Sequence, residues 1–309
     1  MSTLSLIGMS KNSGKTTVLN TLLGFYYRRG LVLGLTSIGR DGEDQDLVTH
    51  TEKPRIFIGK GTIFATASSL FAFCDVTREI LMATGINTPL GEVIILRARS
   101  GGYVQLAGPS INAQMIQICD AMLEYGADRV IVDGAFARKT PASPAVSQTA
   151  ILCTGAALNR NMLHVIEETR HVHDLLKSDK ASCELIELTK EFSLALVNDD
   201  KTCRGFEQAA LTDTLANDLI KEGINNSVIV AQDASKFLIN QETHQKLIIR
   251  KIKILVRECT KVLAVTINPV SPYDYEFDAN EFKKALKGVI ATPVINVMEE
   301  GEELYDLLV

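Results

Sequence analysis

The feature that most constrains the fold of this chain is a short polar loop that joins an apolar run to an amphipathic segment near its start. The mostly apolar run at residues 4–7 ends in Gly8, and residues 14–16 (Gly-Lys-Thr) open a segment whose apolar residues recur at helical spacing. A second apolar run follows at residues 31–35. This succession predicts a strand, a loop, a helix and a strand, which is the opening unit of a doubly wound parallel sheet.

The loop has the composition of a phosphate-binding loop. The backbone N–H groups of such a loop and of the helix that follows form a nest for phosphate oxygens. Lys15 would act as the catalytic cation on the terminal phosphates of a nucleotide, and the Thr16 hydroxyl would bind Mg²⁺. The strict pattern has a glycine six residues before the lysine, but Met9 occupies that position here and the glycine comes one residue earlier. The residues expected to contact the nucleotide are Gly8, Lys11, Asn12, Ser13, Gly14, Lys15, Thr16 and Thr17.

Acidic residues follow two of the expected strands. Asp133 follows the predicted strand at residues 129–132, at the sheet edge that would carry the loop, and is predicted to hold Mg²⁺ directly or through water. Asp41 and Asp44 lie in an acidic loop after the second strand, and one of them is expected to bind the metal or to orient the attacking water, with Asp44 the candidate ligand. The alternatives are an ordinary Asp-Gly turn at Asp133, an exposed acidic loop at residues 41–46 and, for Lys15, a chance lysine after a glycine turn.

A late strand end offers a candidate contact to the base of the nucleotide. Asn268 follows the predicted strand at residues 262–267 and would lie on the same edge as the loop. An asparagine amide can read a purine because it presents a donor beside an acceptor. The sequence has no Asn-Lys-x-Asp motif that would specify guanine, so it leaves ATP and GTP open.

Between these motifs the sequence pattern changes to short apolar runs separated by glycine-rich turns. Glycine-rich turns at residues 59–61 and 99–102 separate short apolar runs, and each turn is predicted to close an antiparallel hairpin beside the parallel core. A helix capped by Ser110 is expected to run to residue 124. The strands expected to pair are residues 55–58 with 62–66 and residues 92–98 with 103–107.

Residues 184–254 have strand and helix patterns of their own, which predict a second α/β lobe. The expected domains are a nucleotide-binding core at 1–183, this lobe at 184–254, and a return to the core at 255–309. The fold class is therefore α/β, with a doubly wound, mainly parallel sheet and antiparallel hairpin additions. The expected elements are strands at 149–153, 185–188, 194–197, 227–231, 237–239, 262–267 and 294–297, and helices at 211–221, 243–253 and 282–286.

Bulk composition narrows the class of protein. The charged residues sum to a net charge of −5, which does not favour binding to nucleic acid or to an anionic membrane surface. No apolar run reaches the ~20 residues of a membrane span, and no signal peptide pattern is visible, so we expect a cytoplasmic protein. The six cysteines are scattered singly, as buried free thiols in a reducing compartment would be.

The loop resembles that of one branch of the P-loop nucleotidases. The early glycine and the loop at residues 8–17, the Thr36-Ser37 strand end and the run Asp133-Gly134-Ala135 resemble the dethiobiotin-synthetase branch. The resemblance implies a sheet of the P-loop NTPase type, and members of this branch often form homodimers. Dethiobiotin synthetases have a lysine where this chain has Thr36-Ser37, so an ATP-dependent ligase is the alternative rather than the leading interpretation.

A longer resemblance is to the KamB-like reactivase subunits of lysine 5,6-aminomutase. It is carried by residues 34–43, 87–92, 106–110, 132–135 and 143–144, and it covers the first half of the chain more strongly than the second. It implies Mg-ATP hydrolysis together with a MutS-like partner ATPase. It also implies that the pair restores an adenosylcobalamin- and pyridoxal-phosphate-dependent aminomutase after its cobalamin is damaged. A slow nucleotide-binding scaffold is the third interpretation.

Overall fold

The computed structural model describes residues 3–38, 56–136, 146–147 and 149–308, and within these residues the core is a nine-stranded sheet. Neighbouring strands run parallel from β17 to β4, and only β6 runs antiparallel to both of its neighbours. The α/β class with a mainly parallel sheet is therefore confirmed. In spatial order the strands are β17 (Val294–Asn296), β16 (Lys261–Asn268), β9 (Thr149–Gly155), β1 (Thr3–Gly8), β8 (Arg129–Phe136), β2 (Leu33–Ser37), β4 (Ile63–Ala67), β6 (Gly91–Ala98) and β5 (Arg78–Thr88).

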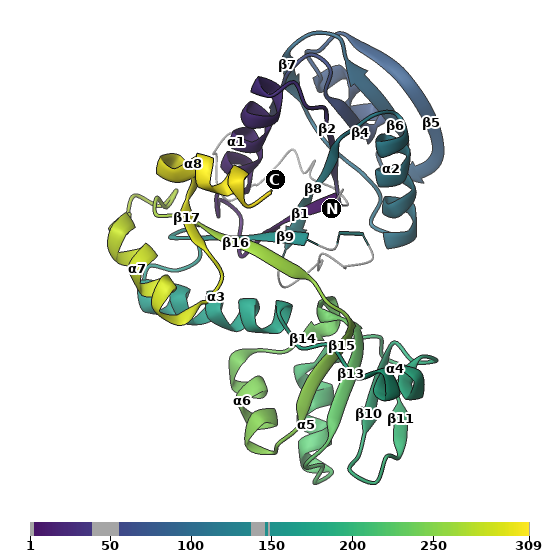
Figure 1. Ribbon diagram of the computed structural model, residues 1–309, viewed down its shortest axis with the longest axis vertical. Coiled ribbons are helices and arrows are strands. Elements are labelled where there is room, and N and C mark those ends of the chain that lie inside the picture. The colour runs from purple at the N-terminus through teal and green to yellow at the C-terminus, as the bar shows by residue number, and fades with distance from the viewer. Residues whose placement is uncertain (1–2, 39–55, 137–145, 148, 309) are drawn as a thin grey trace.

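Helices cover both faces of this sheet (Figure 1). The α1 (Lys15–Arg28) and α8 (Val297–Asp306) helices pack on one face, where their apolar residues join Leu6 and Ile131 in one buried cluster. The α2 (Asn112–Glu124), α3 (Met162–Leu176) and α7 (Ala279–Val289) helices pack on the other, against the alternate residues of the same strands, such as Ile7 and Val132. Because successive strand residues point to opposite faces, strands buried on both sides read as continuous apolar runs. The sheet is doubly wound, as predicted.

A smaller, four-stranded sheet lies below the large one in Figure 1. The chain enters this region after α3 and returns through β15 directly into β16 of the large sheet. The strands in spatial order are β11 (Cys203–Gly205), β10 (Leu194–Val197), β13 (Val228–Asp233) and β15 (Lys253–Glu258), and the helices are α4 (Cys183–Thr189), α5 (Asp213–Lys221) and α6 (Gln241–Ile249).

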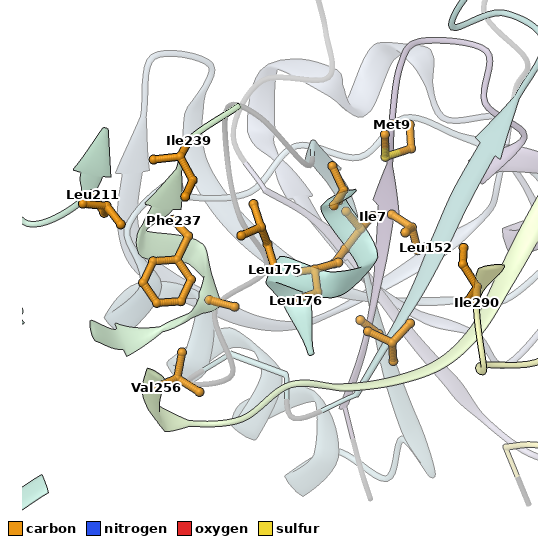
Figure 2. Close-up of a cluster of buried hydrophobic side chains, with 14 of the residues drawn as sticks. Ile7, Met9, Leu152, Leu175, Leu176, Leu211, Phe237, Ile239, Val256 and Ile290 are labelled. Carbon is orange, nitrogen blue, oxygen red and sulfur yellow. The ribbon is translucent and has the colours of Figure 1, made fainter. Parts of the chain in front are cut away.

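The two sheets share one hydrophobic cluster. Figure 2 shows Leu175 and Leu176, at the end of α3, between Ile7 of the large sheet and Phe237 near the small one. Phe237 belongs to β14 (Phe237–Leu238), which pairs with β12 (Leu211–Thr212). Continuous apolar packing resists separation because each buried apolar side chain contributes about 1.5–3 kcal/mol. The small sheet is thus joined to the large one through α3 and through the strand connection into β16.

Two elements in this second region differ from the sequence prediction. Residues 185–188 were predicted as a strand but lie in α4, because the Ser182 hydroxyl accepts a hydrogen bond from Leu185 N at 3.3 Å and caps a helix there. The helix predicted at residues 243–253 ends at Ile249 in α6. Lys251 has a φ of 56°, in the left-handed region that ends helices, and residues 253–258 continue as β15.

Both predicted hairpins are wrong in their pairing. The turn at residues 59–61 separates β3 (Ile56–Ile58) from β4, yet β3 pairs with β7 (Gly102–Val104), and β4 pairs with β2 and β6. The hairpin of this region is formed instead by β5 and β6. The turns were recognisable from their glycines, but the partners of each strand are distant in sequence, and turn chemistry does not determine them.

The ends of two helices also needed correction. Ser110 does not cap α2; the helix starts at Asn112 after Ile111, and no side chain accepts a hydrogen bond from its first turn. The final predicted strand shortens to Val294–Asn296, because Asn296 caps α8 by accepting a hydrogen bond from Met298 N at 3.3 Å.

Within the described part of the chain, no helix combines the length and the apolar character that a membrane crossing needs.

Candidate functional site

The polar loop between β1 and α1 has the backbone of an anion-binding turn. Asn12 and Gly14 both have positive φ, at 60° and 91°, so the chain turns sharply twice before the helix starts at Lys15. Gly14 is the N-cap residue, and no side chain caps α1. The first amides of a helix have no intrahelical acceptor, and here they open onto the loop. The sequence prediction of a strand, a polar loop and a helix at this place is confirmed.

Lys15 folds back across this loop toward the end of β1. A Cβ atom built on Gly8 would lie 2.6 Å from the Lys15 Nζ and 2.9 Å from the Ser13 Oγ. Gly8 leaves the space that the Lys15 ammonium occupies, and a side chain at this position would require the end of the lysine to shift. Met9, in the strict glycine position, is instead buried against the α3 face, and its N–H donates to the Cys153 carbonyl at 2.9 Å.

A row of polar side chains lies beneath the loop on the α1 face of the sheet. The register pairs Ser37 of β2 with Asp133 of β8, and Cys153 of β9 with Thr266 of β16. Each comes two residues after an apolar residue of the α1-facing cluster, so all four share that face. All four are buried, and they flank the end of β1 on both sides.

Among the described residues, buried hydroxyls near this edge lack a hydrogen-bond partner. They are the Oγ atoms of Ser13 and Ser37 and, on the α2 face of β2 beside Gly108, the Oγ1 of Thr36. A buried polar group without a partner costs about 1–3 kcal/mol, so such groups point to a ligand or water that completes them. A Cβ atom on Gly134, which has a φ of 86°, would lie 2.8 Å from the Ser37 Oγ. Gly134 therefore lets the Ser37 hydroxyl lie directly beside the Asp133 turn.

Charged groups on either side affect the pKa of Cys153, in the middle of this row. Burial raises the pKa of the Cys153 thiol to about 11, while Thr266 and the Lys15 ammonium lower it and Asp133 raises it. The Lys15 ammonium and the Asp133 carboxylate thus have opposite effects on the pKa of the same buried thiol. With that pKa the thiol stays protonated near neutral pH, so Cys153 forms a wall of the site rather than a nucleophile. The Asp133 Oδ1 accepts a hydrogen bond from Gly134 N at 2.7 Å.

Asn268, at the end of β16, reaches the loop and makes a contact there that the sequence did not predict. Its Nδ2 donates to the Asn12 carbonyl at 3.0 Å, and its Oδ1 accepts from Val270 N at 3.3 Å. Both ends of the amide are therefore engaged by backbone. One N–H of Nδ2 and one lone pair of Oδ1 have no hydrogen bond in these contacts, so the interpretation of Asn268 as a reader of the base stays a prediction.

The structure brings most of the predicted site residues to one edge of the sheet. Asp41 and Asp44 lie outside the described residues. Sequence reasoning missed Ser37 and Cys153 as members of the site; the available signal was their position at the ends of strands that neighbour β1 or its partner. The predicted residues found at this edge are Gly8, Lys11, Asn12, Ser13, Gly14, Lys15, Thr16, Thr17, Asp133 and Asn268.

Comparisons with protein-family models, curated proteins and solved structures find no match. The amides, the ammonium and the unpartnered hydroxyls of this edge all suit an anion with several oxygens, and its carboxylate suits a cation bound beside that anion.

A hollow with a volume of about 170 Å³ lies on the small sheet between α4 and β10. Lys201 and Glu184 form an ion pair at 2.6 Å on its lining, and both side chains are more than two-thirds exposed. Exposed pairs of this kind contribute little. Among the described residues, no buried side-chain atom without a partner lines this hollow. The sheet edge at the β1–α1 loop, with Lys15 and Asp133, is therefore the better candidate site.

Proposed function

We propose that this chain is a P-loop nucleoside triphosphatase that binds Mg-ATP at the β1–α1 loop. The observation that carries the proposal is the Lys15 side chain folded against Gly8, at the start of α1, which no side chain caps. The arrangement of the sheet supports it as well, because ligands of doubly wound sheets bind at the carboxyl ends of the strands. ATP is chosen over GTP from the sequence resemblance.

Each residue would act on the phosphates in a defined way. The loop amides and Lys15 would neutralise the charge that spreads over the phosphate oxygens during transfer of the terminal phosphoryl group. Thr16 and Asp133 would hold Mg²⁺, and Ser37 would donate or accept beside Asp133. Asp41 or Asp44 would orient the attacking water. Cys153 and Thr266 would line the buried side of the site.

The donor set fits a magnesium ion that arrives with the nucleotide. Mg²⁺ is usually held by one or two carboxylates together with substrate phosphates and water, rather than by a complete protein cage. Within the described residues, no group of three or more His, Cys, Asp or Glu side chains could hold a metal. A single carboxylate next to a hydroxyl matches that partial site. When bound, Mg²⁺ would screen the charge of the phosphates.

We further propose that hydrolysis drives a partner protein, lysine 5,6-aminomutase, to exchange its damaged cobalamin, together with a MutS-like ATPase. The support is the sequence resemblance, and the second lobe, which is joined to the site through α3 and β16, offers a route for coupling. A nucleotidase can shift a partner's conformation only if its ATP and ADP states bind that partner with different affinities.

Recovery of aminomutase turnover tests this function. Inactivated lysine 5,6-aminomutase is mixed with this chain, the partner ATPase, Mg²⁺ and fresh adenosylcobalamin, with ATP or a non-hydrolysable analogue. We expect recovery with ATP and none with the analogue, because only hydrolysis returns the complex to its starting state. Equal recovery with both nucleotides would reject the hydrolysis-driven mechanism, and no recovery with either would reject the reactivase role.

A further inference from the structure

The contact between Asn268 and the phosphate-type loop suggests a role that the nucleotide proposal does not contain. The Asn268 Nδ2 donates to the Asn12 carbonyl at 3.0 Å, across 256 residues of sequence. Asn12 has a φ of 60°, an uncommon conformation for a residue with a side chain. One hydrogen bond from a distant strand therefore fixes the peptide at the sharpest point of the loop.

The Asn268 side chain is itself held on several sides. Its Oδ1 accepts from Val270 N, and its own carbonyl accepts from Ala156 N at 2.9 Å. A Cβ atom on Gly14 would lie 3.2 Å from the Asn268 Cβ, and one on Gly155 would lie 2.9 Å from it. The Asn268 Cβ thus lies between two glycines, and the amide is held toward the loop by its hydrogen bonds to Asn12 and Val270.

We propose that Asn268 is a positioning residue that holds the loop in its phosphate-accepting shape and does not read the base. The inference rests on the proposed nucleotide site and extends it to regulation. Two residues separate β15 of the small sheet from β16, which ends at Asn268. A displacement of the second lobe along this strand would therefore loosen or restore the contact to Asn12, and so change the affinity of the loop for phosphate.

The test uses a ligand that lacks a base. Binding of Mg-ATP and of magnesium tripolyphosphate is measured for the full chain, for Asn268→Ala and for Asn268→Leu, which keeps the approximate volume without a donor. Val270→Ala is the matched control, since this exposed side chain lies on the same segment and its N–H remains. Hydrogen exchange at residues 10–17 is followed without any ligand.

We expect both Asn268 variants to bind the two ligands more weakly, by about three- to tenfold for each ligand. This is the net effect of one neutral hydrogen bond. Exchange at residues 10–17 should be faster in both variants and unchanged in Val270→Ala. If the variants bind ATP more weakly but bind tripolyphosphate and exchange hydrogen as the wild-type chain does, Asn268 contacts the base and the inference is overturned. Unchanged binding of both ligands would overturn it as well. If the wild-type chain binds neither ligand, the nucleotide proposal fails, and the exchange rates alone decide whether Asn268 holds the loop.

Discussion

Lys15→Ala is expected to lower ATP turnover by about 100-fold or more and to weaken ATP binding, while the protein stays folded. The ammonium of Lys15 lies against Gly8 inside the loop, where it would face the terminal phosphates. A charge directed at the transferred phosphoryl group typically contributes several kcal/mol in the transition state, and about 1.4 kcal/mol corresponds to tenfold in rate. Alanine is a good helix former, so the start of α1 should persist.

The control for this change is Lys60→Ala. Lys60 is exposed on the turn between β3 and β4, so its removal changes the net charge equally without touching the site. Turnover is measured as phosphate release, and folding is measured by the thermal unfolding midpoint. If a folded Lys15→Ala protein hydrolyses ATP as fast as the wild-type chain, the β1–α1 loop does not take part in hydrolysis.

Asp133→Asn is expected to raise the Mg²⁺ concentration needed for half-maximal turnover by about 10- to 100-fold, the range seen when carboxylates that support a metal are changed. The substitution removes the charge but keeps an Oδ1 that can accept from Gly134 N, so the turn should survive. Binding of nucleotide without metal should change little. The measurement is a Mg²⁺ titration of turnover for both proteins.

Asp120→Asn is the matched control, because Asp120 is exposed on α2 and points away from the core. It should leave the Mg²⁺ titration where the wild-type protein has it. If Asp133→Asn also leaves the titration in place, Asp133 is an ordinary turn residue at the end of β8, and the metal must be held by other groups.

Local patterns predicted much of the core. The strand, loop and helix at residues 3–28, the strand at residues 149–153 and the strand at residues 262–267 each carry a strong apolar run bounded by glycine or polar residues. Parallel strands buried on both faces have this signal, which does not depend on their neighbours. The doubly wound arrangement follows, because alternating strands and helices have few other ways to bury their faces.

Non-local pairing was beyond reach of the same reasoning. β3 pairs with β7 rather than with β4 across the glycine turn, and nothing in the turn itself distinguishes these outcomes. α4 was mistaken for a strand because its short apolar run fits both periods, and the capping hydroxyl of Ser182 decided the matter. Short segments are decided by such single contacts.

The candidate site shows the same division. Lys15, Thr16 and Asp133 could be named from local motifs, whereas Ser37 and Cys153 join them only through the register of four neighbouring strands. The contact of Asn268 with the Asn12 carbonyl is a property of the folded loop, which no residue pattern encodes. Residue types could identify the chemistry of the site, and the topology was needed to complete its membership.

The most direct test of the central claim is a crystal structure of the full chain with Mg²⁺ and a non-hydrolysable ATP analogue. We predict that the β- and γ-phosphates lie against the amides of residues 13–16, with the Lys15 Nζ on the terminal phosphate and Mg²⁺ near Thr16 and Asp133. The Asn12 carbonyl should still accept from Asn268. A nucleotide bound elsewhere, or phosphates turned away from the β1–α1 loop, would contradict the assignment of this edge as the phosphate site.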